Sequence, residues 1–282
     1  MKNTDSYQLW QGTNGLLPLV FDSPHSSANF PATVETLATS DELKTGWDAF
    51  VDELWAPSIE VGASLLAAKF SRMYIDPNRA ESDIDTDLIA GNWPGKIKPT
   101  EYTARGMGLL RRFALPGKPM YADPLSVQEV EKRLANYYRP YHQCLKELLD
   151  TFHDNFGAVW HVDCHSMKSK GNQMNIDAGE PRADIVLGDA DGKTADAEFT
   201  DYIRQAFSAL GYHVAVNYPY KGGYCVHAYG DPSAQRHSVQ IEINRALYMN
   251  EADFTRNDNF TAFQRDLFSI SKQIAAYIKD RL

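Results

Sequence analysis

The chain has 282 residues, 43% of them apolar, and its 28 basic and 37 acidic residues give a net charge of −9. An acidic chain without a basic cluster is a poor candidate for binding nucleic acid, and its apolar stretches are too short to span a membrane. Three cysteines without a Cys-x-x-Cys pair exclude a disulfide scaffold and a zinc ribbon, and the lack of a secretory signal at the N-terminus indicates a cytoplasmic protein.

The first eighty residues alternate between strand-like and helical patterns. Leu16–Phe21 is a short apolar run that ends in polar turn residues, which is typical of a buried strand. A capped amphipathic helix is predicted to begin near Ser40, and a second helix over 57–68. The pattern then predicts a strand over 69–75, which stops before Pro77 because the residue preceding a proline is forced out of helical geometry.

A long segment rich in glycine and proline, residues 80–122, predicts an irregular excursion, and long ordered loops are usually functional. Residues 125–156 form the longest helical pattern, with Pro140 as a site for a kink. Further strands are expected over 158–163, 212–218 and 238–243, and further helices over 195–210 and 259–278. This alternation predicts a single three-layer α/β/α domain over residues 1–282, with a mixed, mostly parallel central sheet and an insertion around 80–122.

Polar residues that could take part in catalysis or ligand binding follow several of the predicted strands. His25 follows the first strand, Asp76-Pro-Asn-Arg79 the second, and Asp163-Cys-His-Ser166 the strand that begins at residue 158. Glu242 lies inside an otherwise apolar alternating strand. Because ligands of open α/β sheets bind beyond the carboxyl ends of the strands, these segments are expected to converge on one site.

The alternation within residues 158–165 separates two sets of side chains. If this segment is extended, His161, Asp163 and His165 share one face of the sheet, whereas Cys164 points to the other. This argues against a Cys–His nucleophilic pair and favours Cys164 as a small buried core residue.

Two histidines from separate strands and a carboxylate would make a three-ligand zinc site with a position left for water. His25 and His165 are the candidate ligands, and Glu242 is the candidate general base beside them. The alternative is that each histidine caps a strand end or fills a polar pocket, since a solitary histidine is weak evidence and no His-Glu-x-x-His motif occurs.

Five motifs, in this order along the chain, resemble the N-formylglutamate amidohydrolase family. They are Ser23-Pro-His-Ser26, Ser71-Arg-Met-Tyr-Ile-Asp-Pro-Asn-Arg79, Asp163-Cys-His-Ser-Met167, Lys221-Gly-Gly223 and Gln240-Ile-Glu-Ile-Asn-Arg-Ala-Leu-Tyr-Met249. A more distant similarity connects them with aspartoacylase and zinc carboxypeptidases. The resemblance implies a carboxypeptidase-like α/β fold, one catalytic Zn²⁺ per chain, and hydrolysis of an N-acyl amino acid such as N-formyl-L-glutamate, a reaction of histidine degradation.

Carried over by position, the resemblance implies His25 and His165 as zinc ligands and Glu242 as the general base. Arg79 would polarise the scissile carbonyl and stabilise the oxyanion, and Asn78 would help to hold a substrate carboxylate. Zinc carboxypeptidases take an acidic ligand three residues after the first histidine, but this chain has Ala28 there. The family pattern then favours Asp48 as the third ligand. Asp52 and Glu53 are the alternatives. If none of the three binds a metal, they are solvent-exposed acidic residues in the first turn of a helix, where they interact favourably with the helix dipole.

One motif departs from the family pattern. After Lys221-Gly-Gly223 the family has Thr-Arg-His-Tyr-Gly, whereas this chain has Val226-His-Ala-Tyr-Gly230, so His227 replaces an arginine that could pair bidentately with a carboxylate. Positive charge for the substrate could come instead from Lys221, Arg105, Arg111 or Arg112.

Three functions therefore remain open. The leading hypothesis is a zinc-dependent amidohydrolase that acts on a small N-acyl amino acid. A carboxypeptidase-like amidase acting on a peptide or cell-wall fragment would use the long 80–122 loop to shape a larger cleft. A non-catalytic binding protein would keep the fold, and the missing acid at position 28 is the feature that favours it. The acyl group, the amino acid and the oligomeric state stay undetermined.

Overall fold

A computed structural model describes all of residues 1–282 and contains one eight-stranded sheet. The strand order is β1-β2-β4-β3-β9-β12-β10-β11. The strands are β1 (Lys2–Asn3), β2 (Tyr7–Trp10), β3 (Leu19–Ser23), β4 (Ser64–Ala68), β9 (Val159–Met167), β10 (Ile185–Gly188), β11 (Val214–Val216) and β12 (Arg236–Asn244). The four central strands β4, β3, β9 and β12 run parallel, and β2 and β10 join them antiparallel. The predicted α/β class with a mixed, mostly parallel sheet is confirmed.

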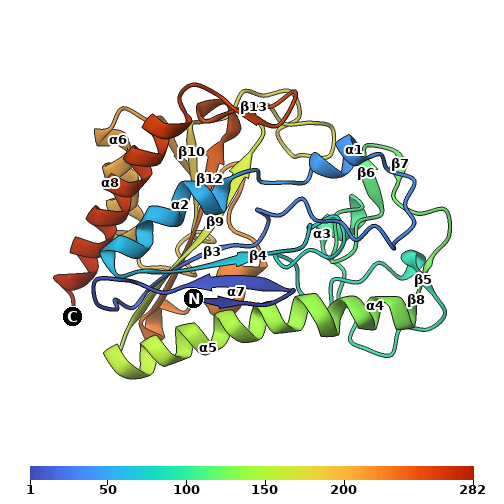
Figure 1. The fold of residues 1–282 in the computed structure, drawn as a ribbon, viewed down its shortest axis with the longest axis horizontal. Helices are drawn as coiled ribbons and strands as arrows, with labels where there is room; N and C mark the ends of the chain where they lie inside the picture. Colours follow the sequence, from blue (N-terminus) through green and yellow to red (C-terminus); the bar gives the residue numbers. More distant parts are fainter.

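Helices cover both faces of this sheet (Figure 1). One face packs against α2 (Val51–Trp55), α6 (Ala197–Ala209) and α8 (Phe260–Lys279), and together they bury the larger hydrophobic core. The other face packs against the long helical segment of α4 (Val127–Arg133) and α5 (Arg139–Phe156), which buries a second core. Helix α7 (Tyr224–Tyr229) contacts β9 and β12 on the part of the sheet that carries polar side chains.

Short elements gather beyond one edge of the sheet, to the right in Figure 1. They are α1 (Ser40–Lys44), α3 (Glu101–Ala104), and the ribbons β5 (Ile89–Ala90) with β8 (Leu125–Ser126) and β6 (Phe113–Leu115) with β7 (Lys118–Pro119). A further ribbon joins β13 (Met249–Asn250) to β14 (Thr255–Arg256). Single 3₁₀ turns occur at Thr86–Leu88, Pro232–Ala234 and Arg245–Leu247. Most of residues 80–122 is irregular, and this segment supplies side chains to the pocket described below.

The structure corrects the predicted elements between residues 40 and 75. The helix expected from Ser40 is split into α1, which ends at Lys44, and α2, which begins only after Phe50 has adopted a left-handed conformation with φ of 63°. The helix expected over 57–68 is a 3₁₀ turn, Ala56–Val61, which ends at Gly62 with φ of 95°. Strand β4 follows at once, so the strand predicted over 69–75 begins five residues earlier and 69–75 is a turn. Pairing of β4 with β2 on one side and with β3 on the other outweighs the helical propensity of its Leu-Leu-Ala-Ala run.

Pro140 is accommodated without breaking the long helical segment. Five residues of π-helix, Leu134–Tyr138, connect α4 and α5. Proline has no backbone N–H, so residue 140 cannot donate to the carbonyl four residues earlier, and the wider turn absorbs this loss. The expected bend therefore takes the form of a π-helical turn just before the proline.

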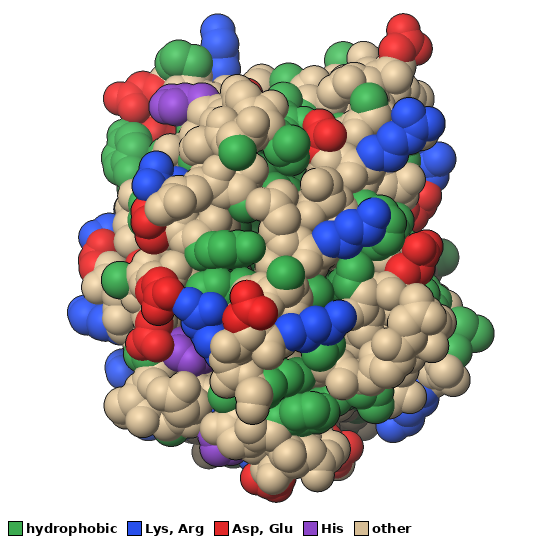
Figure 2. Space-filling model, turned by 90° about the vertical axis from the view of Figure 1, so that its left-hand side faces the viewer, with side chains coloured by type: hydrophobic (Ala, Val, Ile, Leu, Met, Phe, Trp, Pro, Cys, Tyr) green, Lys and Arg blue, Asp and Glu red, His purple; other side chains and the backbone are tan.

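None of the helices combines the length and the apolar character needed to cross a lipid bilayer. Figure 2 shows the end of the molecule formed by α6 and α8, where basic and acidic side chains are interspersed and no continuous basic area forms. This agrees with the net charge of −9.

Candidate metal and hydrolytic site

Strand β9 separates apolar from polar side chains, as its alternation predicts. Trp160, Val162 and Cys164 point into the larger hydrophobic core. His161, Asp163 and His165 point to the opposite face and are buried there. Because β3, β4, β9 and β12 are parallel, their carboxyl ends meet at one edge, and His165 lies near that edge. The chain leaving β3 brings His25 to the same place.

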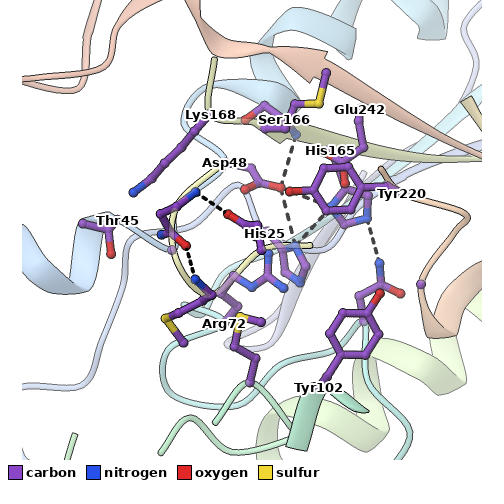
Figure 3. Close-up of a pocket in the computed structure, with 18 of the residues that line it drawn as sticks. His25, Thr45, Asp48, Arg72, Tyr102, His165, Ser166, Lys168, Tyr220 and Glu242 are labelled. Atoms are coloured by element: carbon purple, nitrogen blue, oxygen red, sulfur yellow. Dashed lines mark hydrogen bonds and ion pairs between the residues drawn. The ribbon is translucent and has the colours of Figure 1, made fainter. Parts of the chain in front are cut away.

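Three ligand-type atoms converge at this edge, in the centre of Figure 3. Nδ1 of His25 lies 3.1 Å from Nδ1 of His165, and Oδ2 of Asp48 lies 3.5 Å and 3.1 Å from these two nitrogens. All three residues are at most 2% exposed. The structure thus brings together the two histidines and the aspartate that the sequence analysis named as candidate metal ligands.

The other ring nitrogen of each histidine faces a buried carboxylate. Nε2 of His25 lies 2.7 Å from Oδ1 of Asp76. Nε2 of His165 lies 2.8 Å from Oδ1 of Asp163, an oxygen that makes no hydrogen bond, and 2.9 Å from the amide nitrogen of Asn78. With a ring proton on each Nε2 alone, both Nδ1 atoms would keep lone pairs for a metal ion. A carboxylate behind the ring is the usual way in which a metal-binding histidine is oriented.

The donor set fits a small divalent cation. In that tautomer the two Nδ1 nitrogens and the Asp48 oxygen have no proton with which to bond one another, and a cation would satisfy all three. Ligands at roughly 2.0–2.1 Å from a tetrahedral zinc ion are about 3.3 Å apart, close to the separations found here. Burial disfavours the charged form of His165, but Asp163 and Asp48 outweigh burial and raise its pKa well above the usual range. The site therefore attracts positive charge.

Asp48 comes from the loop between α1 and α2 rather than from the start of a helix. Its backbone N–H donates to the carbonyl of His25 at 3.0 Å, and Nη2 of Arg245 donates to its Oδ1 at 2.9 Å. The alternatives lie elsewhere, because the Asp52 side chain is outside the cluster and Glu53 pairs with Arg256 at the surface. Since Asp48 completes the set, the missing acid at position 28 leaves no gap among the donors.

Glu242 lies beside this cluster on β12. It is the register partner of His165 on the neighbouring parallel strand, and it lines the same cavity of about 160 Å³ (Figure 3). Nε2 of Gln240 donates to Oε1 of Glu242 at 2.9 Å, and no cationic side chain forms an ion pair with it. Burial raises the pKa of Glu242 to about 7, and the negative charge of Asp48 adds to this effect. A carboxyl group with this pKa can both accept and release a proton near neutrality.

Arg79 and Asn78 enter the cavity from the loop after β4. Arg79 donates from Nε to the Met107 carbonyl at 2.9 Å and from Nη1 to the Asn78 carbonyl at 2.7 Å, and it stacks on the ring of Tyr102. The side chain of Asn78 contacts protein groups at both ends, His165 and Asp163 on one side and the N–H of Cys225 on the other.

The Gly-Gly pair of the fourth sequence motif allows this contact. A Cβ atom on Gly223 would lie 2.3 Å from Nδ2 of Asn78, so a larger residue there would displace the amide from His165.

Three of the sequence-predicted substrate residues do not reach the cavity. Lys221 is exposed and pairs with Asp191, and the half-buried Arg105 pairs with Glu101. His227 is exposed on α7. Sequence reasoning also gave no role to Asp76 and Asp163, although both stand in quoted motifs. The i, i+2 spacing of Asp163 and His165 on one strand was a signal that could have identified the second.

His142 on α5 fixes the loop that carries Asn78 and Arg79. Its ring bridges the Pro77 carbonyl, at 2.9 Å from Nε2, and the Tyr229 hydroxyl, at 2.8 Å from Nδ1. Burial lowers the pKa of His142 to about 4. Between pH 4 and the ordinary value of 6.5 the unfolded chain binds more protons at this residue, so the stability it confers is present above pH 6.5 and lost as the pH falls. We expect this residue to contribute about 1–3 kcal/mol to the loss of unfolding free energy between pH 7 and pH 4.

Urea unfolding of wild type and His142→Gln at several pH values measures this contribution, with His153→Gln on the surface of the same helix as the control. The His142→Gln protein should show the shallower pH dependence. An identical dependence in all three proteins would contradict the assignment.

Comparison with known proteins gives a consistent result. A family model described as N-formylglutamate amidohydrolase matches residues 17–249. An N-formylglutamate deformylase of Pseudomonas putida is 29% identical over 243 residues, which cover 85% of this chain and 84% of that protein. One from Pseudomonas aeruginosa is 30% identical over 241 residues, 84% of each chain. The crystal structure of an N-formylglutamate amidohydrolase from Ralstonia eutropha is 40% identical, with a TM-score of 0.95 over 99% of this chain and 100% of that one. The matched segment contains every residue of the cluster.

Proposed function

The chain belongs to the N-formylglutamate amidohydrolase family, a family of amide-bond hydrolases, and we propose that it cleaves N-formyl-L-glutamate to formate and L-glutamate. We further propose that His25, Asp48 and His165 hold one divalent metal ion, with zinc as the expected metal. The observation that carries the proposal is the convergence of these three donors in a buried cavity with Glu242 beside them.

The size of the cavity supports a small substrate. Its volume of about 160 Å³ is below the roughly 300–1,000 Å³ that is typical of sites for drug-sized ligands. An N-formyl amino acid is a compact molecule, whereas a peptide needs an extended cleft. This favours the acyl amino acid over the peptide or cell-wall fragment considered as an alternative.

A metal ion bound to the three donors would supply Lewis acidity, which lowers the pKa of water and polarises a carbonyl oxygen. The protein supplies the groups that move protons and orient the substrate. Oε1 of Glu242 is held by Gln240, so Oε2 is available to accept a proton from the attacking water. The same carboxyl group then delivers this proton to the nitrogen of the departing amino acid as the C–N bond breaks. The second proton of the former water also passes to this nitrogen, so that amide and water become a carboxylate and a protonated amine.

Arg79 is assigned to the formyl oxygen. The guanidinium group donates to the backbone carbonyls of Met107 and Asn78 and stacks on Tyr102, and these contacts fix its plane. A preorganised cation stabilises the negative charge that develops on the carbonyl oxygen without reorganisation during the reaction. Asp76 and Asp163 hold the two histidines in orientation.

The test combines turnover with metal analysis of the purified protein. We expect hydrolysis of N-formyl-L-glutamate with release of formate, about one equivalent of bound divalent metal per chain, and loss of activity on chelation that the added metal restores. The kcat/KM for N-formyl-L-glutamate should exceed that for formylated di- and tripeptides. A protein that binds no transition metal and leaves all N-formyl acids unchanged would refute the proposal.

A further inference from the structure

The cavity beside the metal donors is lined by five arginines, and three of them are neutralised by the protein itself. Arg72 donates twice to Asp76, at 2.7 and 3.0 Å, and Arg182 donates twice to Asp177, at 2.6 and 2.8 Å. Arg245 donates to Asp48 at 2.9 Å. Each of these guanidinium groups already has a carboxylate, so none is free to take the carboxylate of a ligand.

The two remaining arginines, Arg79 and Arg111, are different. Arg79 makes hydrogen bonds to carbonyl groups alone. Arg111 makes no hydrogen bond, its Nε is buried without a partner, and the residue is only 8% exposed. Its nearest carboxylate oxygen, Oδ2 of Asp76, is 3.6 Å from Nη2 and is the oxygen that Arg72 already holds.

The backbone aims Arg111 into the cavity. Residues 107 and 111 form an isolated bridge, and the Leu109 carbonyl within that turn accepts from the N–H of Asp76 at 2.9 Å. Arg112, the next residue, points the other way and pairs with Asp85 and Asp87. The turn therefore fixes Arg111 next to the loop that carries Asn78 and Arg79.

A buried guanidinium group without hydrogen bonds is costly, because the protein replaces none of the water that solvated it. Burial and the nearby charge of Arg72 lower the pKa of Arg111 to about 9, so the group remains cationic at neutral pH. An anion that entered the cavity would supply the missing partner. Arginine suits this role because its planar fork binds a carboxylate with two parallel hydrogen bonds.

On the basis of the function proposed above, we propose that Arg111 binds a carboxylate of the amino-acid part of the substrate and so selects acidic N-acyl amino acids. Of the four basic residues that the sequence analysis offered for this charge, Lys221, Arg105, Arg111 and Arg112, only Arg111 lines the cavity. With Arg79 assigned to the formyl oxygen, the two arginines that donate no hydrogen bond to a protein carboxylate hold the two polar ends of the substrate.

The test is kinetic and uses the metal-loaded full chain. Arg111→Met should raise the KM for N-formyl-L-glutamate by about 30- to 300-fold and change kcat by less than about tenfold, as expected when a charge-assisted pair is lost from binding. Arg111→Lys keeps the positive charge but loses the two parallel N–H groups of the guanidinium. Its KM should lie between those of wild type and Arg111→Met. Arg105→Met is the matched control, since it removes an arginine that pairs with Glu101 outside the cavity, and it should match wild type.

Substrates with one carboxylate neutralised identify the contact. N-formyl-L-glutamine lacks the side-chain charge, and the α-amide of N-formyl-L-glutamate lacks the other. The substrate that lacks the carboxylate bound by Arg111 should have a higher KM than N-formyl-L-glutamate with wild type. Its KM should not increase further with Arg111→Met, because the contact is already absent. An unchanged KM in a folded, metal-loaded Arg111→Met protein, with wild type active, would overturn the assignment and leave the proposed function standing.

If wild type is inactive on all these substrates, the proposed function fails, and calorimetric titration with L-glutamate tests Arg111 by itself. Arg111→Met should then bind L-glutamate at least about 30-fold more weakly than Arg105→Met does. Equal affinities would overturn the assignment.

Discussion

Glu242→Gln should lower kcat for N-formyl-L-glutamate by between about 10²- and 10⁴-fold, the range that a positioned general base contributes. Glutamine has nearly the same shape and keeps the contact with Gln240, but its amide cannot accept a proton from water at neutral pH. The residue lies in the cavity without a cationic partner, so its replacement leaves no buried cation unpaired. The variant should therefore fold, retain its metal and show a KM close to that of wild type.

The pH profile gives an independent test of the same role. Burial raises the pKa of Glu242 to about 7, and the base is active only when it is deprotonated. Activity should therefore fall as the pH drops through this pKa, and a bound cation, which favours the carboxylate, would move the inflection below 7. Glu242→Gln should lose this acid limb. Glu147→Gln, on the exposed side of α5, is the control and should keep both the rate and the profile. A Glu242→Gln protein as active as wild type would contradict the assignment.

The sequence predicted the location of the site better than the details of the fold around it. His165 and Glu242 could be placed because strand alternation and the carboxyl-end rule depend on local pattern alone. The strand β4 was misplaced since Leu and Ala favour helices intrinsically, and only pairing with β2 and β3 makes this segment extended. Strands β2 and β10, with four residues each, were too short to give a recognisable period.

The third donor and the positive charge of the cavity show the limit of sequence reasoning in another way. Asp48 is separated from His165 by more than a hundred residues, and no spacing rule distinguishes it from Asp52 or Glu53. Only the left-handed turn at Phe50, which splits the expected helix, leaves Asp48 in a loop facing the histidines. In the same way, Arg111 and Arg112 are neighbours in the sequence, and the turn at residues 107–111 decides which of them is buried in the cavity.

His165→Ala should abolish stable metal binding, from about one equivalent per chain to less than roughly a tenth, because two donors remain where structural and catalytic zinc sites use at least three. His153→Ala is the matched control, as its ring lies away from the cavity and contacts the Ala234 carbonyl and Asp154. Asp163→Asn should have the smaller effect, a loss of about 10- to 100-fold in affinity, since it removes the carboxylate behind the ring and keeps the ligand.

Metal content after dialysis against buffered zinc, together with the shift in unfolding temperature on zinc addition, measures both effects without reference to activity. Zinc at 100 times its dissociation constant should stabilise wild type by about 2.7 kcal/mol, and this increment should vanish in His165→Ala. In the metal-free protein a protonated His165 faces the buried carboxylates of both Asp48 and Asp163, and Arg245 adds a second positive charge beside Asp48. A cation that replaces this proton should be released as the pH falls. At neutral pH the zinc affinity should decrease in the order His153→Ala, Asp163→Asn, His165→Ala, an order that metal ligation predicts and a purely structural ion pair does not. Equal zinc affinity in wild type and His165→Ala would show that the converging donors serve the fold alone.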